Sequence, residues 1–301
     1  GNTVQSMGNN HDQAGVREVK RSIYDCRDDG VQNHEELNNR WEEVDRLSLR
    51  LDQAIKDKLT EDQIHDIQMC RNQAYILYSG LASVAYTRHS RLPPQIDLSD
   101  VLRVGSNFIC DSYLNLYDNE QTDAFEFLTE EKGLADQKAV DYLLKILFQS
   151  YVDVDLFFQA EIEGELKRRY PEKELNDLSF KERESVEYWI KGKLRDEQYV
   201  TNMKNDIFKR VAENFRLPSE YSDNEKIKNY IMQCALVCAY FVVQDPKNVF
   251  GSLPNRDSHF DKQVYRSYTR DGSRVDFVVW PVLYQYEGNL GLLGKGVLQG
   301  K

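Results

Sequence analysis

The stretch that decides the fold is DQKAVDYLLKILFQSYVDVDLFFQAEIEGELKRR, residues Asp136–Arg169. Its apolar side chains recur every three or four residues, at Val140, Leu143, Leu144, Leu147, Tyr151, Val154, Phe157 and Phe158. This spacing places them on one face of an α-helix. Pro171 ends the pattern because proline lacks an N–H group and its ring clashes with the preceding turn. One long helix in mid-chain therefore predicts a mainly α protein, organised as a multi-helix bundle.

Toward the N-terminus, a second stripe predicts a helical pair over residues 14–95, after a flexible lead-in at residues 1–13. Apolar side chains follow at steps of four and three, interrupted by Ser48, at Leu37, Trp41, Val44, Leu51 and Ile55. This pattern is typical of either a coiled coil or a helical hairpin. The tetrad Thr60–Gln63 has the form of a capping box, so a second helix should begin there. Pro93 and Pro94 should end it.

Residues 96–301 are expected to form one helical domain that ends in a β-hairpin. Asn119 can cap a separate helix, Ser179-Phe180-Lys181-Glu182 is a capping box, and Asn224 should begin an apolar helix that stops before Pro246. Residues 247–273 are predicted to be loop. The segment RVDFVVWPVLYQY, from Arg274, is β-branched and aromatic, so it predicts a strand that pairs with Leu290–Leu298. This hairpin, residues 274–298, should pack on the helices because two strands alone are marginally stable.

The overall charge argues against nucleic acid as a partner. The chain has 301 residues, 41% of them hydrophobic, which is enough for a real core, and a formal net charge of −11. An acidic surface repels nucleic acid and anionic lipid alike. The charge is uneven, however, because residues 251–301 carry a net +2 and the rest carries −13. Any anionic partner should therefore approach the C-terminal end.

Cysteine usage and hydropathy indicate where the protein works. The five cysteines include no CxxC pair, which fits a reducing compartment, so we expect a cytoplasmic protein. The longest apolar run, Cys234–Val243, has ten residues, about half of what a membrane-crossing helix needs. No spanning helix is predicted.

No motif in the sequence predicts catalysis, a metal site or a cofactor. The glycines around Lys295 do not have the P-loop spacing, and Gly296 stands where that motif needs Ser or Thr. Carboxylates crowd the segment from Asp153 to Glu165, but no Glu-x-x-His repeat accompanies them. A non-enzymatic protein is expected. The alternative is a metal-dependent hydrolase whose site joins these carboxylates to a distant histidine only in the folded chain.

Basic and aromatic side chains interleave near the C-terminus, which makes this region the candidate lipid or anion site. The basic candidates are Arg266, Arg270, Arg274 and Lys295. Tyr265, Tyr268 and Trp280 lie between them, and such mixtures can meet phosphate headgroups with some apolar insertion. The alternative is a set of ordinary surface arginines beside a core strand. Lys295 should either enter a polar pocket or face outward beside the arginines.

Two parts of the sequence together resemble a known family. They are LNLYDNEQTDAFEFL (Leu114–Leu128) and the tail, with Gln244-Asp245-Pro246 after the cysteine-containing helix, Val279-Trp280-Pro281 and the closing Lys295-Gly296. From about Leu98 to Lys301 the chain resembles the C-terminal domain of the mitochondria-eating protein family. The resemblance implies a cytoplasmic protein recruited to mitochondria, at the outer membrane or in the matrix. It also implies a role in mitochondrial quality control and mitophagy, self-association and affinity for cardiolipin.

The sequence hypothesis is therefore a non-enzymatic scaffold or adaptor of mitochondrial quality control. We expect homo-oligomers formed through Leu37, Trp41, Val44 and Leu51 of the N-terminal pair. We expect contact with a cardiolipin-containing surface or with mitochondrial outer-membrane proteins through the C-terminal basic residues. A protein–protein interaction module without lipid affinity is the alternative.

Overall fold

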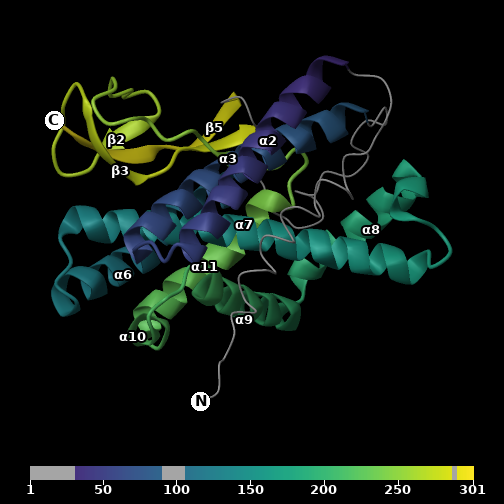
Figure 1. Cartoon of the computed structure of the whole chain (residues 1–301), viewed down its shortest axis with the longest axis horizontal. Helices are drawn as coiled ribbons and strands as arrows, with labels where there is room; N and C mark the ends of the chain where they lie inside the picture. The colour runs from purple at the N-terminus through teal and green to yellow at the C-terminus, as the bar shows by residue number, and fades with distance from the viewer. Residues whose placement is uncertain (1–30, 90–105, 287–289) are drawn as a thin grey trace.

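The computed structural model describes residues 31–89, 106–286 and 290–301. In these residues the protein is mainly α, with two small three-stranded sheets near the C-terminus that pack on the helices (Figure 1). The predicted fold class is confirmed. The lead-in predicted at residues 1–13 and the helix end predicted at Pro93 and Pro94 lie outside the described residues. The boundary predicted at residues 95/96 stays a prediction.

Helix α7 (Asp136–Arg169) has the predicted bounds and forms the centre of the molecule. Its 34 residues correspond to a length of about 50 Å. It packs against the helices α3 (Glu61–His89), α8 (Phe180–Gly192), α9 (Glu197–Asn214) and α11 (Glu225–Val242) and against strand β3 (Val275–Trp280). Most of its side chains between Ala139 and Phe158 are buried, on more than one face. This all-round burial explains why the other helices assemble on it.

Helices α2 (Val31–Lys56) and α3 (Glu61–His89) form the predicted N-terminal pair. The capping box is present, because the Thr60 backbone N–H donates to Gln63 Oε1 at 3.0 Å and the Gln63 N–H donates to Thr60 Oγ1 at 3.3 Å. The two helices pack on each other, and α3 also packs on α7. The pair is thus a hairpin laid against the body of the protein.

The remaining helices follow α3 in chain order. They are α5 (Ser106–Leu116), α6 (Thr122–Glu126), α8 (Phe180–Gly192), α9 (Glu197–Asn214), α10 (Ser219–Ser222) and α11 (Glu225–Val242). The capping box of Ser179 with Glu182 and the cap by Asn224 are confirmed. The prediction of a separate helix that begins at Asn119 is wrong. Two π-helical turns, Tyr117–Gln121 and Phe127–Glu131, keep the backbone helical through that position.

The C-terminal β-hairpin is more divided than predicted. The strands are β1 (Val249–Phe250), β2 (Tyr265–Ser267), β3 (Val275–Trp280), β4 (Leu283–Tyr286), β5 (Leu290–Gly294) and β6 (Gly296–Gly300). One sheet has the order β1-β4-β5 and the other β2-β6-β3, with β2 parallel to β6. The strand predicted from Arg274 is interrupted at Pro281, because proline has no backbone N–H to donate to a neighbouring strand. Segments predicted to be loop supply β1 and β2.

The glycines near the C-terminus allow close packing where the chain passes from one sheet to the other. A Cβ on Gly296 would lie 2.3 Å from the Tyr265 ring and 2.7 Å from the Trp280 carbonyl oxygen. Trp280 is buried and stacks on Tyr113 of α5, with ring centroids 5.2 Å apart. The glycine therefore lets β6 approach the aromatic layer that joins the sheets to the helices.

Candidate interaction surfaces

The predicted basic residues lie at both ends of β6. Arg266 on β2 pairs in register with Val297, near the start of β6, where Lys295 also lies. At the other end, the Arg270 Nε donates to the carbonyl oxygen of Gly300 at 2.9 Å. Arg274 forms an isolated bridge with His259 beside the last residue. The four side chains thus belong to one layer but not to one compact cluster.

Several bases of this layer are neutralised by nearby acids. Arg256 pairs with Asp276 at 2.9 Å, and Lys262 pairs with Asp271 at 2.8 Å. The exposed Arg274 and Lys295 instead contact backbone carbonyl oxygens, of Asp257 at 2.9 Å and of Lys262 at 3.4 Å. Lys295 therefore faces outward rather than into a polar pocket.

Among the described residues, Arg266 and Arg270 have only long contacts to carboxylates, each 3.8 Å, with Asp118 and Asp276 respectively. Arg266 also lies over the ring of Tyr117, 5.2 Å from its centroid. Burial raises the pKa of Tyr117 to about 12, so this ring is a neutral phenol at physiological pH. Together with Arg274 and Lys295, these two arginines retain charge for an anionic partner.

Two of the three aromatic side chains named for this region are buried, and Tyr268 packs half-buried against the core. Trp280 is 1% exposed and Tyr265 is 7% exposed, and both belong to the main core. They are therefore not placed to insert into a lipid surface. The predicted mixture of bases and aromatic rings separates in the structure into outward arginines and an inward ring layer, as a strand with alternating sides allows.

The residues predicted to mediate self-association are used inside the chain. Trp41, Val44 and Leu51 are buried, and Leu37 packs partly buried against the core. Leu51 belongs to a separate small cluster with Ala54, Ile64 and Ile67 at the loop end of the pair. The heptad stripe thus stabilises the α2–α3 hairpin of one chain, and contact between copies through it requires α2 of one copy to pack on α3 of another.

A buried polar seam joins α3 to the body of the protein. Its α3 residues fall at steps of three and four, so they share one face: His65, Gln68, Asn72, Tyr75, Ser79 and Ser83. Gln68 Nε2 donates to the Asn214 carbonyl oxygen at 2.6 Å. Asn72 Nδ2 donates to Gln149 Oε1 of α7 at 2.8 Å. Hydrogen bonds therefore give the docking of the hairpin a defined register.

The seam contains a buried ion pair. Lys247 Nζ lies 2.7 Å from Asp155 Oδ1, and the two side chains are 9% and 1% exposed. Tyr75 and Ser79 of α3 donate to Asp155 Oδ2 at 2.9 and 2.8 Å, and Lys247 Nζ donates to Ser79 Oγ at 2.8 Å. A serine beside a lysine can form a nucleophilic pair, but here the carboxylate holds both. The arrangement is structural.

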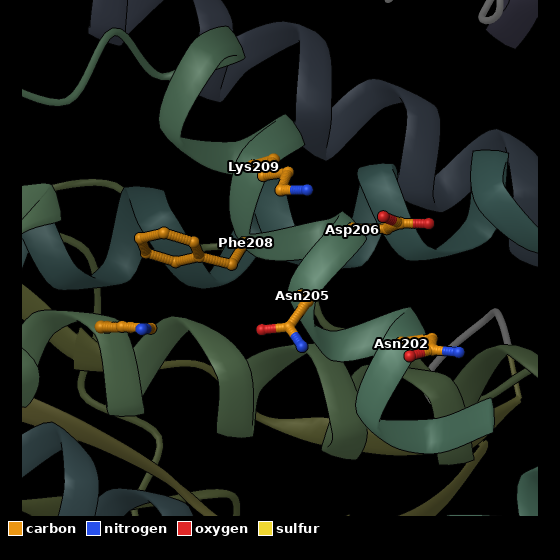
Figure 2. A pocket seen from close by; sticks show the side chains of 6 residues that line it. Asn202, Asn205, Asp206, Phe208 and Lys209 are labelled. Atoms are coloured by element: carbon orange, nitrogen blue, oxygen red, sulfur yellow. The ribbon is translucent and has the colours of Figure 1, made fainter. Parts of the chain in front are cut away.

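A shallow groove opens between α9 and α11 (Figure 2). Its volume is about 610 Å³, and it is lined by Asn202, Asn205, Asp206, Phe208, Lys209 and Lys228. Figure 2 shows Phe208 and Asp206 pointing to opposite sides of α9. The sequence analysis did not identify this groove, since its residues come from two helices whose approach only the fold determines.

The residues that the hydrolase alternative required are engaged elsewhere. Glu165 accepts from Arg168 and Arg169, and Asp153 accepts from Gln149 and Asn214. His65 contacts the Phe215 carbonyl oxygen at 2.8 Å. Within the described ranges, no group of three or more histidine, cysteine or acidic side chains is arranged to hold a metal ion. These contacts give a metal-dependent hydrolase no support.

None of the described helices has both the length and the apolar character needed to cross a membrane. The fold and its surfaces define a mainly α protein whose candidate sites are an exposed basic layer, a docked hairpin and an open groove. A family model described as mitochondria-eating protein matches residues 106–299, which is more than half of the chain. The chain belongs to this family, which implies a role in mitochondrial quality control. Neither the comparison with curated proteins nor that with solved structures returned a match.

Proposed function

We propose that the protein is a non-enzymatic scaffold or adaptor in mitochondrial quality control, cytoplasmic and recruited to mitochondria. In this role it self-associates and engages cardiolipin or mitochondrial outer-membrane proteins. The observation that carries the proposal is the family match over residues 106–299. The absence of a metal-binding cluster among the described residues is compatible with a scaffold but does not by itself argue for one.

The proposed lipid contact is the basic layer of Arg266, Arg270, Arg274 and Lys295. All four are exposed, and none has a carboxylate closer than 3.8 Å among the described residues. Cations near an anionic surface contribute about 1 kcal/mol each. Because Tyr265 and Trp280 are buried and Tyr268 is half-buried, the contact should be mainly electrostatic and weakened by salt.

Flotation of the full chain with vesicles tests this contact. We expect recovery with vesicles that contain cardiolipin, at about 0.15 M salt, and little with phosphatidylcholine alone. The variant Arg266→Ala/Arg274→Ala/Lys295→Ala should lose most of the binding. A matched control is Lys56→Ala/Lys58→Ala/Lys181→Ala, which removes the same charge from exposed lysines elsewhere. Equally low recovery with both vesicles would favour the alternative, a protein–protein module without lipid affinity.

Self-association is proposed to use the N-terminal pair. The support is the heptad stripe of Leu37, Trp41, Val44 and Leu51, which offers a seam that a second copy can fill with identical contacts. Because this seam is closed within the chain, association through it means that α2 of one copy packs on α3 of the other.

A further inference from the structure

The groove between α9 and α11 carries more positive than negative charge, because Lys209 and Lys228 line it together with one acid, Asp206. Among the described residues, Lys209 and Lys228 make no ion pair, whereas the neighbouring Lys226 pairs with Glu131 at 3.7 Å. Lys204, one turn before Phe208 on α9, also makes none among these residues. Unpaired ammonium groups beside a half-buried ring suit a ligand that brings negative charge.

The amide groups of the groove indicate what kind of anion fits. Asn205 is exposed and makes no hydrogen bond within the described part of the chain, and Figure 2 shows it pointing from α9 toward the neighbouring helix. Asn202 accepts from Gln198 at 3.0 Å, which leaves its NH₂ group available. A carboxamide offers both donors and an acceptor, so it matches a peptide N–H and C=O. At neutral pH a phosphate ester offers hydrogen-bond acceptors but no donor, so it would give the Asn205 side-chain oxygen no partner.

The spacing along α9 fits an extended chain. Asn202 and Lys209 are seven residues apart, which corresponds to about 10 Å of helix. About three residues of an extended peptide cover the same distance. Phe208 lies between them and packs partly buried against the core, with Lys228 Nζ 5.9 Å from its ring centroid. An apolar side chain of the ligand can rest on this ring.

We propose that the α9–α11 groove binds an acidic segment of a partner protein in extended conformation. The ligand backbone bonds to the amides of Asn202 and Asn205, and its carboxylates pair with Lys209 and Lys228. One of its apolar side chains covers Phe208. This site shares no residue with the basic layer of Arg266, Arg270, Arg274 and Lys295, so the test of peptide binding is independent of the test of lipid binding.

Fluorescence anisotropy with the full chain tests the proposal. The probe is a fluorescein-labelled, eight-residue peptide in which glutamate and leucine alternate. We expect saturable binding that weakens as salt is raised from about 0.05 to 0.5 M. Lys209→Glu/Lys228→Glu should weaken it at least about ten-fold, because two charge-assisted hydrogen bonds are lost. Asn205→Ala should weaken it several-fold without any change of charge.

The control variant Lys56→Glu/Lys181→Glu makes the same charge change at exposed lysines outside the groove and should bind like the wild type. Melting curves of each variant check that the fold is retained. No binding by the wild type, or equal weakening by the control variant, would overturn the proposal. Competition distinguishes the ligand class. Inorganic phosphate and cardiolipin vesicles are each added at the same concentration of negative charge as unlabelled peptide. If either displaces the labelled peptide as well as the unlabelled peptide does, and Asn205→Ala binds like the wild type, the groove is a general anion site and the peptide assignment is overturned.

Discussion

His65 shows how one side chain links the stability of the fold to pH. Its ring is 6% exposed and stacks on Phe215 with centroids 3.9 Å apart. The carbonyl oxygen of Phe215 can only accept, so the Nε2 of His65 carries the proton of their 2.8 Å contact. Burial lowers the pKa of His65, an effect reinforced by Lys145 of α7. The hydrogen bond and the carboxylates of Glu61 and Asp62 oppose it but do not prevail.

The sign of this shift gives a prediction. The folded state favours neutral His65, so its contribution is complete above the unfolded pKa of about 6.5 and is lost as the pH falls through the lower folded value. We expect the free energy of unfolding to fall between pH 7.5 and 5. The variant His65→Gln keeps a donor for Phe215 but cannot titrate. Urea unfolding of both proteins across this range isolates the His65 contribution, and parallel pH profiles would contradict it.

Among pairs of helices, the contact of α3 with α7 is the most informative. On α3 the apolar residue Cys70 is exposed and Leu77 is half-buried. The face toward α7 is instead the polar seam. Polar residues at heptad spacing were visible in the sequence, but their partners Gln149, Asp155 and Lys247 lie 76 to 168 residues away. Such pairing cannot be derived from local periodicity.

The buried ion pair of this seam predicts a large and specific loss of stability. Lys247→Met leaves the Asp155 carboxylate buried with two neutral donors and no cation in hydrogen-bond contact, which typically costs about 3–5 kcal/mol. Lys262→Met, which breaks an exposed pair with Asp271, should cost less than about 1 kcal/mol. Adding Asp155→Asn to Lys247→Met should recover part of the loss, because no charge is then buried. Chemical denaturation measures all three, and similar values for Lys247→Met and Lys262→Met would refute the argument.

Local signals explain which elements the sequence predicted correctly. Capping boxes at Thr60 and Ser179 and the cap at Asn224 depend on residues within three positions, and all three are present. The division of the C-terminal segment depends on contacts far along the chain, since β6 pairs with β2 and β3 at once. The four basic candidates were found by composition, but the α9–α11 groove was not, because no local pattern marks it.

For the entire chain, the main question is how copies contact one another. The α2–α3 hairpin precedes the residues that match the family model. The heptad stripe of α2 packs on α3, so exchange through this stripe would open the short connection at residues 57–60 and let α2 of one copy pack on α3 of another.

Two leucines of α2 distinguish exchange from association of outer surfaces. Leu51, in the heptad stripe between α2 and α3, is 2% exposed, whereas Leu49 on the same helix is 54% exposed. We expect light scattering to give a mass above 35.2 kDa that rises with concentration. Leu51→Ala removes packing between α2 and α3, so it should lower stability by about 2–5 kcal/mol. It should leave the mass nearly unchanged, because an exchanged copy makes the same contact and both states are weakened alike. Leu49→Ala should change neither stability nor mass. A strict monomer at all concentrations would refute self-association, and loss of mass with Leu49→Ala would assign it to the outer face of α2 instead of to exchange of α2.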